Sequence, residues 1–110
     1  MSYKVIPTPK FKKEAKRLAK KYNSLRNELT DFSLVLADNP TQGTSLGSST
    51  FKVRLAIKSK GKGKSGGARI ITYVVTDDQE IYLLTIYDKS EVENVSDKVL
   101  IDLVSQVKRS

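Results

Sequence analysis

Residues 51–69 read FKVRLAIKSKGKGKSGGAR, and the fold expected for the whole chain builds outward from this stretch. Apolar and polar residues alternate through its first half, which predicts a half-buried strand. The core side of that strand would carry Phe51, Val53, Leu55 and Ile57, and its outer side Lys52, Arg54 and Lys58. Residues 59–67 contain four glycines, three lysines and no apolar side chain, which is typical of a flexible, exposed loop. With seven basic residues and no carboxylate, residues 51–69 predict an anionic partner.

The residues after this loop predict a β-hairpin. Residues 68–76 (ARIITYVVT) and 80–87 (EIYLLTIY) are rich in β-branched and aromatic side chains, and a short acidic turn separates them. A short turn joins antiparallel strands, so the start of the first strand lies opposite the end of the second. We therefore expect Arg69 to lie near Tyr87 and Lys89.

The first part of the chain predicts a short strand and a helical hairpin. Residues 3–7 (YKVIP) are typical of a brief strand, and Thr8-Pro9 suits the cap and first turn of a helix over residues 10–21. Apolar residues recur there at helical spacing. The same spacing returns in residues 25–38, after an interruption at Asn23-Ser24 that can cap a second helix.

Two further segments complete the expected fold. Residues 41–50 (TQGTSLGSST) are polar and contain glycine, which predicts a surface loop. After a cap at Ser96, an amphipathic C-terminal helix is marked by Leu100, Ile101, Val104 and Val107. The order β-α-α-β-β-β-α across residues 1–110 predicts one α+β domain. We expect an antiparallel β-sheet with the N-terminal α-helical hairpin packed on one face and the other face open.

Composition narrows the chemistry available to the chain. Its 110 residues include 20 basic and 12 acidic ones, and the net charge of +8 favours a polyanionic partner. The absence of cysteine and histidine removes thiol nucleophiles, the usual zinc ligands and the commonest general base. Any catalysis must therefore use Lys, Arg, Tyr, Asp or Glu, and we expect neither a metal nor a cofactor. Because it has no signal peptide and no membrane-length apolar run, we expect a cytoplasmic protein without a membrane partner.

The helix expected over residues 10–21 carries seven basic residues and a single acidic one, Glu14. Charged side chains opposite an apolar face commonly do no more than contact water. Like charges spaced three and four residues apart repel one another, however, and bound phosphates would relieve that repulsion. We predict that Lys13, Lys16 and Lys20 contact a phosphate backbone.

The glycine-lysine loop and the end of the hairpin each have two interpretations. The loop is either a disordered basic linker or a mobile cationic clamp, and it lacks the GxxxxGK[ST] spacing of a P-loop. At the hairpin end, Arg69, Tyr87 and Lys89 form either a cleft or a rim. On a rim, Arg69 would pair with Asp88. In a cleft, Lys or Tyr would move a proton while Arg stabilises a pentavalent phosphate, which permits phosphodiester cleavage without histidine.

These residues resemble a known family. The run FKVRLAIKSKGKGKSGGARIITYVV followed by EIYLLTIYDKSEVENVS is similar to the RelE/ParE superfamily of bacterial type II toxins, and within it to the HigB-like branch. The resemblance implies a compact, RelE-like α+β fold. It also implies an mRNA endonuclease that acts in the ribosomal A site. Its expected partner is a cognate antitoxin protein with a DNA-binding helix-turn-helix.

The resemblance assigns roles to individual residues. Lys52 and Arg54 match the basic pair that faces mRNA, and Arg69 matches the arginine that contacts the scissile phosphate. Ser90 stands where RelE has a second arginine, and Val95-Ser96 near where RelE has a tyrosine. The expected catalytic residues are Arg54, Arg69, Tyr87 and Lys89, with Tyr87 or Lys89 moving the proton. The expected RNA-binding residues are Lys52, Lys58, Lys60, Lys62, Lys64, Lys13, Lys16 and Lys20.

Two other functions are compatible with the sequence. A ParE-like inhibitor of DNA gyrase would share the fold and need no cleft chemistry, so the basic strand would be only a surface. A non-catalytic basic RNA-binding domain would bind RNA with steep salt dependence and leave it intact. The glycine-lysine loop resembles the nuclease branch and so favours the nuclease over the gyrase inhibitor.

Overall fold

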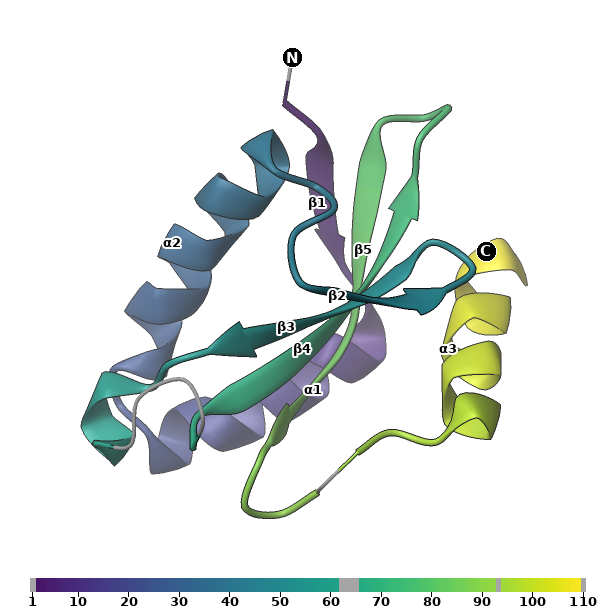
Figure 1. Ribbon diagram of the computed structural model, residues 1–110. Helices are drawn as coiled ribbons and strands as arrows, with labels where there is room; N and C mark the ends of the chain where they lie inside the picture. The colour runs from purple at the N-terminus through teal and green to yellow at the C-terminus, as the bar shows by residue number, and fades with distance from the viewer. Residues whose placement is uncertain (1, 62–65, 93, 110) are drawn as a thin grey trace.

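The structure is a computed structural model that describes residues 2–61, 66–92 and 94–109. Figure 1 shows three α-helices and a twisted β-sheet. The elements are β1 (Lys4–Pro7), α1 (Pro9–Lys21), α2 (Leu25–Asp38), β2 (Thr44–Gly47), β3 (Thr50–Leu55), the 3-10 turn η1 (Lys58–Lys60), β4 (Ala68–Val75), β5 (Glu80–Asp88) and α3 (Asp97–Arg109). The predicted α+β class is confirmed, and β2 is an additional strand.

The predicted start of the first helix is confirmed, and Thr8 also ties that helix to the sheet. The Thr8 hydroxyl accepts a hydrogen bond from the Phe11 amide at 3.3 Å, and Pro9 occupies the first turn. The same hydroxyl lies 2.8 Å from the Leu83 carbonyl, to which it donates. The beginning of α1 is therefore fixed against β5.

The sheet is mixed rather than wholly antiparallel. Its strand order is β1-β5-β4-β3-β2, and β4 is the central strand. Four strands pair antiparallel with their neighbours, but β1 runs parallel to β5. A parallel pair needs a long connection between its strands, and the two helices with β2, β3 and β4 supply it. The predicted β4–β5 hairpin is confirmed, with Arg69 opposite Tyr87.

Residues 41–50 are not only a loop, because β2 lies within them and forms an edge of the sheet. Thr44 pairs with Lys52 and Ser45 with Phe51. All four residues of β2 are exposed, so no apolar alternation marks the strand in the sequence. Gly43 leads into it at φ 100°, and a Cβ there would lie 2.5 Å from the Lys52 carbonyl oxygen. Glycine is thus required where β2 approaches β3.

The main core lies between one face of the sheet and the predicted helical hairpin. Its fully buried side chains are Leu18, Leu25, Leu36, Ile57, Ile70, Ile81 and Ile86. From the opening stretch, Val53 and Ile57 are buried as predicted, whereas Phe51 and Leu55 are half-buried. Lys58 was expected on the strand but begins η1 instead.

The second face of the sheet is not open, because α3 packs on it (Figure 1). A smaller core there joins Leu100 and Leu103 of α3 to Ile71, Leu84 and Tyr87 of the sheet. The predicted C-terminal helix and its cap are confirmed, since the Ser96 hydroxyl accepts from the Val99 amide at 3.3 Å. Ile101 was expected on the apolar side but is 70% exposed. Leu103, one turn from Leu100, packs against the sheet in its place.

Candidate nucleic-acid interface and active site

Three of the four predicted catalytic residues form one row across adjacent strands. Arg54 of β3 pairs with Arg69 of β4, and Arg69 pairs with Tyr87 of β5. Directly paired residues point to the same face of a sheet, with Cβ atoms about 5 Å apart. Tyr87 belongs to the core under α3, so the row lies on the α3 face. We call Arg54, Arg69 and Tyr87, for which a catalytic role is proposed below, the catalytic row.

The three members of the catalytic row differ in their exposure. Arg54 is exposed, whereas Arg69 is 4% exposed and Tyr87 6%. The Arg69 guanidinium donates a hydrogen bond from Nη1 to the Ala68 carbonyl at 3.1 Å. Because Arg54 and Arg69 are directly paired, two guanidinium groups lie on one face of the sheet at this place.

The Tyr87 hydroxyl is buried and has no hydrogen-bond partner among the described residues. Burial raises the pKa of Tyr87 above its ordinary value, and the nearby positive charge of Arg69 offsets this only in part. The phenol therefore keeps its proton at neutral pH. In this environment Tyr87 carries the proton that a general acid needs, and its raised pKa makes it a weaker acid than an ordinary tyrosine.

Lys52 and Lys89 border the catalytic row. Lys52 is half-buried, and its Nζ donates to Asn94 Oδ1 at 3.4 Å, which links β3 to the segment between β5 and α3. Lys89 directly follows β5 and is half-buried. Its amide donates to the Gly67 carbonyl at 3.1 Å, so its backbone stays paired with the start of β4. Both lysines are thus held at the end of the sheet where the row lies.

The first half of the glycine-lysine loop is fixed to the joint between α1 and α2. The Lys58 amide donates to Glu28 Oε2 at 2.7 Å, and the Ser59 amide to Ser24 Oγ at 3.0 Å. Ser24 occupies the N-cap position of α2 as predicted, but its hydroxyl makes no cap bond to an amide of that helix and contacts Ser59 and Glu28 instead. Lys58 itself is exposed. Lys62 and Lys64 lie outside the described residues.

Lys60 is not the exposed cation that the sequence predicted. Its side chain is 8% exposed, and its ammonium forms an ion pair with the Asp88 carboxylate. The ammonium also donates to Ser90 Oγ at 3.1 Å and lies 5.6 Å from the centre of the Tyr22 ring. Lys60 was expected to bind RNA, and this expectation is wrong because its charge is already neutralised inside the protein.

Asp88 gathers hydrogen bonds from three parts of the chain. Its side chain is fully buried and accepts from the Lys60 ammonium, from Tyr22 Oη at 2.6 Å and from Ser90 Oγ at 2.7 Å. The Ser90 amide adds a fourth donor at 2.9 Å. Burial alone would raise the pKa of Asp88, but the hydrogen bonds from Lys60, Tyr22 and Ser90 outweigh it and hold the pKa well below its ordinary value.

The rim ion pair between Arg69 and Asp88 is not the arrangement found. Asp88 pairs in register with Ala68 and, one residue along β5 from Tyr87, points to the opposite face of the sheet. Sequence reasoning missed the role of Asp88. The only available signal was a carboxylate at the end of an apolar strand, with a serine two residues later.

The lysines of α1 form a second basic surface that is separate from the catalytic row. Lys13, Lys16 and Lys20 are all exposed, as predicted. Helix α1 packs on the main core, whereas the row lies on the α3 face, so the sheet separates the two basic surfaces. A single extended strand of nucleic acid would have to pass around the edge of the sheet to contact both.

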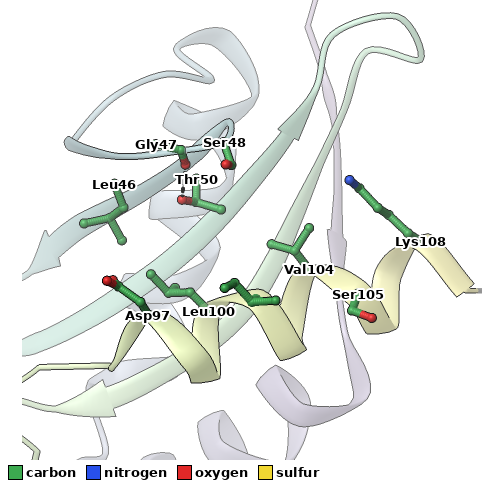
Figure 2. A pocket seen from close by; sticks show the side chains of 10 residues that line it. Leu46, Gly47, Ser48, Thr50, Asp97, Leu100, Val104, Ser105 and Lys108 are labelled. Atoms are coloured by element: carbon green, nitrogen blue, oxygen red, sulfur yellow. Dashed lines mark hydrogen bonds between the residues drawn. The ribbon is translucent and has the colours of Figure 1, made fainter.

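A groove of about 610 Å³ lies between the β2–β3 turn and α3, as Figure 2 shows. Leu46, Leu100 and Val104 form its apolar wall, and Asp97 and Lys108 are the charged residues that line it. None of the catalytic row lines it. Because an apolar wall with a balanced pair of charges does not attract phosphate, this groove is not the site for a polyanion.

No three side chains among the acidic, cysteine and histidine residues of residues 2–61, 66–92 and 94–109 are grouped to hold a metal ion. No helix in the same ranges is long and apolar enough to cross a bilayer.

Comparison with solved structures shows where this fold occurs. A mutant of the E. coli toxin RelE in the free state superposes with a TM-score of 0.65 at 14% identity, covering 97% of this chain and 99% of that one. The RelBE2 toxin-antitoxin complex of Mycobacterium tuberculosis gives 0.60 at 17% identity, covering 80% and 99%. The intact E. coli RelBE toxin-antitoxin complex gives 0.59 at 13% identity, covering 79% and 96%. At these identities the likeness shows the fold.

The sequence itself identifies the family. The family described as the RelE toxin of the RelE / RelB toxin-antitoxin system matches residues 4–107, nearly the whole chain. The match is to the family as a whole, and the HigB-like branch stays a prediction from the loop and hairpin motifs. With its mixed sheet, helical hairpin and row of arginines and tyrosine, the chain belongs to the RelE family of type II toxins.

Proposed function

We propose that this toxin is an endoribonuclease that cleaves mRNA in the ribosomal A site and thereby stops translation. The observation that carries the proposal is the catalytic row, in which Arg54, Arg69 and Tyr87 meet on adjacent strands. Two guanidinium groups and one phenol at one place supply charge stabilisation and a proton donor. Membership of the RelE family supports the same activity.

The proposed reaction is an internal transfer within the RNA. The 2′-OH attacks the adjacent phosphorus while the bond to the 5′ oxygen breaks, which leaves a cyclic phosphate and a 5′-OH end. Arg54 and Arg69 stabilise the charge that accumulates on the phosphate oxygens. Tyr87, which keeps its proton, donates it to the departing 5′ oxygen, and Lys89 is the candidate that takes the proton from the 2′-OH. This chemistry needs no metal ion, because the arginines supply the positive charge.

Access to the site requires a movement of the C-terminal segment. Arg69 and Tyr87 are buried, and Tyr87 lies in the core under α3, so RNA meets exposed Arg54 and half-buried Lys52 first. Contact with Arg69 follows only when that cover shifts. We propose that RNA binding and this shift occur together, since burying a phosphate against Arg69 compensates for the lost apolar contacts of α3.

The remaining cations are proposed to bind RNA backbone. Lys52 borders the row, Lys58 is exposed at the start of η1, and Lys62 and Lys64 continue the same loop in sequence. Lys13, Lys16 and Lys20 lie across the sheet and would contact a second phosphate strand. A folded RNA such as the ribosome offers several strands at once.

A cognate antitoxin with a DNA-binding helix-turn-helix is the proposed partner that silences the toxin in the cytoplasm.

Induced expression in growing bacteria tests this function. Incorporation of labelled methionine should fall within minutes while thymidine incorporation continues, and primer extension should show new 5′ ends within translated transcripts. Ile101→Ala, an exposed change on α3, should act as wild type.

Two outcomes would overturn the proposal. If thymidine incorporation stopped while translation continued, the chain would inhibit DNA synthesis as a ParE-like gyrase inhibitor. If transcripts were bound but stayed intact with and without ribosomes, the chain would be a non-catalytic RNA-binding domain.

A further inference from the structure

We propose that Asp88 is a positioning residue, which through its ion pair with Lys60 fixes η1 and the end of β5 behind the catalytic row. The proposal rests on the nuclease function above and adds to it a residue that does not touch the RNA. It is drawn from a buried, charged group for which the proposed reaction has no direct use.

The contacts of Asp88 join three parts of the chain on the face of β5 opposite the row. The Asp88 carboxylate accepts hydrogen bonds from Tyr22 at the end of α1, from Lys60 of η1 and from Ser90 in the turn after β5. Asp88 itself lies between Tyr87 and Lys89 in sequence. Any shift of its carboxylate must therefore move the backbone that carries both candidates for proton transfer.

The partner of Asp88 is itself held from the opposite side. Lys60 is the last residue of η1, whose first amides are bound by Ser24 and Glu28 at the α1–α2 joint. The ion pair thus connects the helical hairpin, through η1, to the end of β5. On the other face of β5 at this point, Tyr87 lies opposite Arg69.

Stability alone does not account for a charged pair in this place. Removing two charges from water costs free energy that their attraction only about recovers, and an uncharged pair of similar size is commonly as stable. An ion pair with four fixed donors does, however, define a single geometry for the groups that it joins. That property is what a catalytic loop requires.

Three variants separate positioning from stability. Asp88→Asn and Lys60→Met each remove one charge and should lower Tm, because each leaves a buried charge without its partner. The double variant, Lys60→Met with Asp88→Asn, removes both charges and should recover most of the lost Tm. On the ribosome it should still cleave mRNA with kcat about 10- to 100-fold below wild type and with KM unchanged.

A matched control uses the other ion pair that reaches the turn after β5. Arg17 binds Glu91 through two contacts of 3.0 and 3.2 Å, and both side chains are substantially exposed. Exposed pairs of this kind contribute little. Glu91→Gln should therefore keep the wild-type kcat, KM and Tm.

Hydrogen exchange provides a readout that does not depend on cleavage. In the double variant the amides of Ser59, Lys60 and Ser90 should exchange faster than in wild type, while those in the core of β4 stay protected. A double variant with wild-type kcat and unchanged exchange at these amides would overturn the positioning role and leave the nuclease proposal intact. If the wild type itself left mRNA intact, the nuclease function would be wrong and the positioning role with it.

Discussion

At the scale of single residues, neighbours in sequence have opposite environments because a strand alternates its faces. Tyr87 points under α3 and has a raised pKa, whereas Asp88 points toward η1 and has a lowered one. The apolar wall around the phenol disfavours its ionised form, and the donors around the carboxylate favour its ionised form. The ionisation of each group is therefore set by the face on which it lies.

Asp88 should make the stability of the protein depend on pH in the acid range. Its native pKa lies below the ordinary value of 3.8, so as the pH falls the unfolded chain takes up a proton before the native state does. The stabilisation is complete above about pH 4 and is lost as the pH falls toward the native pKa. Urea unfolding between about pH 4 and 2 should show a shallower pH dependence in Asp88→Asn than in wild type. Equal slopes would contradict the lowered pKa.

Gly67 should tolerate no side chain. A Cβ there would lie 2.1 Å from the Leu55 carbonyl oxygen, where β3 and β4 come together at the start of the catalytic row. Gly67→Ala should lower the free energy of unfolding by more than about 2 kcal/mol, because backbone rather than a flexible side chain must move. Gly61 is the control in the same loop, at φ 73° with open space around it.

Gly61→Ala should cost only about 1 to 2 kcal/mol, the penalty of a left-handed conformation without a clash. Chemical denaturation of the two variants gives both values. A cost for Gly67→Ala no larger than that for Gly61→Ala would show that the close approach of β3 and β4 is wrong.

At the scale of elements, the packing of α3 on the sheet can be tested with two neighbouring apolar residues. Leu103 is 5% exposed and Ile101 is 70% exposed. Leu103→Ala should cost about 2 to 4 kcal/mol, since it leaves a cavity against the sheet. Ile101→Ala should change stability by no more than about 0.5 kcal/mol. Thermal unfolding of both variants tests which side of α3 faces the sheet. A larger loss of stability in Ile101→Ala than in Leu103→Ala would contradict the orientation described here.

Much of the fold could be predicted from local patterns. The Thr8 cap, the two helices of the hairpin and the β4–β5 register each depend on residues close together in sequence, and all are confirmed. The strand β2 could not be predicted, because an exposed edge strand has no apolar side to reveal it. The parallel pairing of β1 and the covered second face depend on contacts between distant segments, which no local pattern encodes.

The site was predictable to the same extent. The hairpin register brought Arg69 and Tyr87 together from sequence alone, and pairing with β3 added Arg54. The burial of Lys60 could not be predicted. Composition does not distinguish a lysine that faces solvent from one that pairs with a carboxylate 28 residues away. Charge-rich loops are expected to be exposed, but a buried carboxylate that pairs with one lysine of such a loop allows that lysine to be buried.

At the scale of the whole molecule, the distribution of charge predicts two separable contributions to RNA binding. Replacing Lys13, Lys16 and Lys20 together by alanine should weaken ribosome binding and reduce its salt dependence, because each lost phosphate contact removes about 0.7 to 0.9 from the slope of log K against log salt. At saturating toxin the cleavage rate should stay at the wild-type value, since α1 lies across the sheet from the row. Filter binding at several salt concentrations measures the slope. An unchanged slope would mean that these lysines contact only water.

The central claim is that the catalytic row cleaves RNA, and the most direct test is single-turnover cleavage of mRNA on programmed ribosomes. Arg69→Ala should lower the rate about 100- to 1,000-fold, because it removes a preorganised donor at the phosphate. Arg54→Ala, at an exposed position where folding is not at risk, should lower it as well. Wild type should leave a cyclic phosphate and a 5′-OH. Cleavage by folded Arg69→Ala at the wild-type rate would contradict the account.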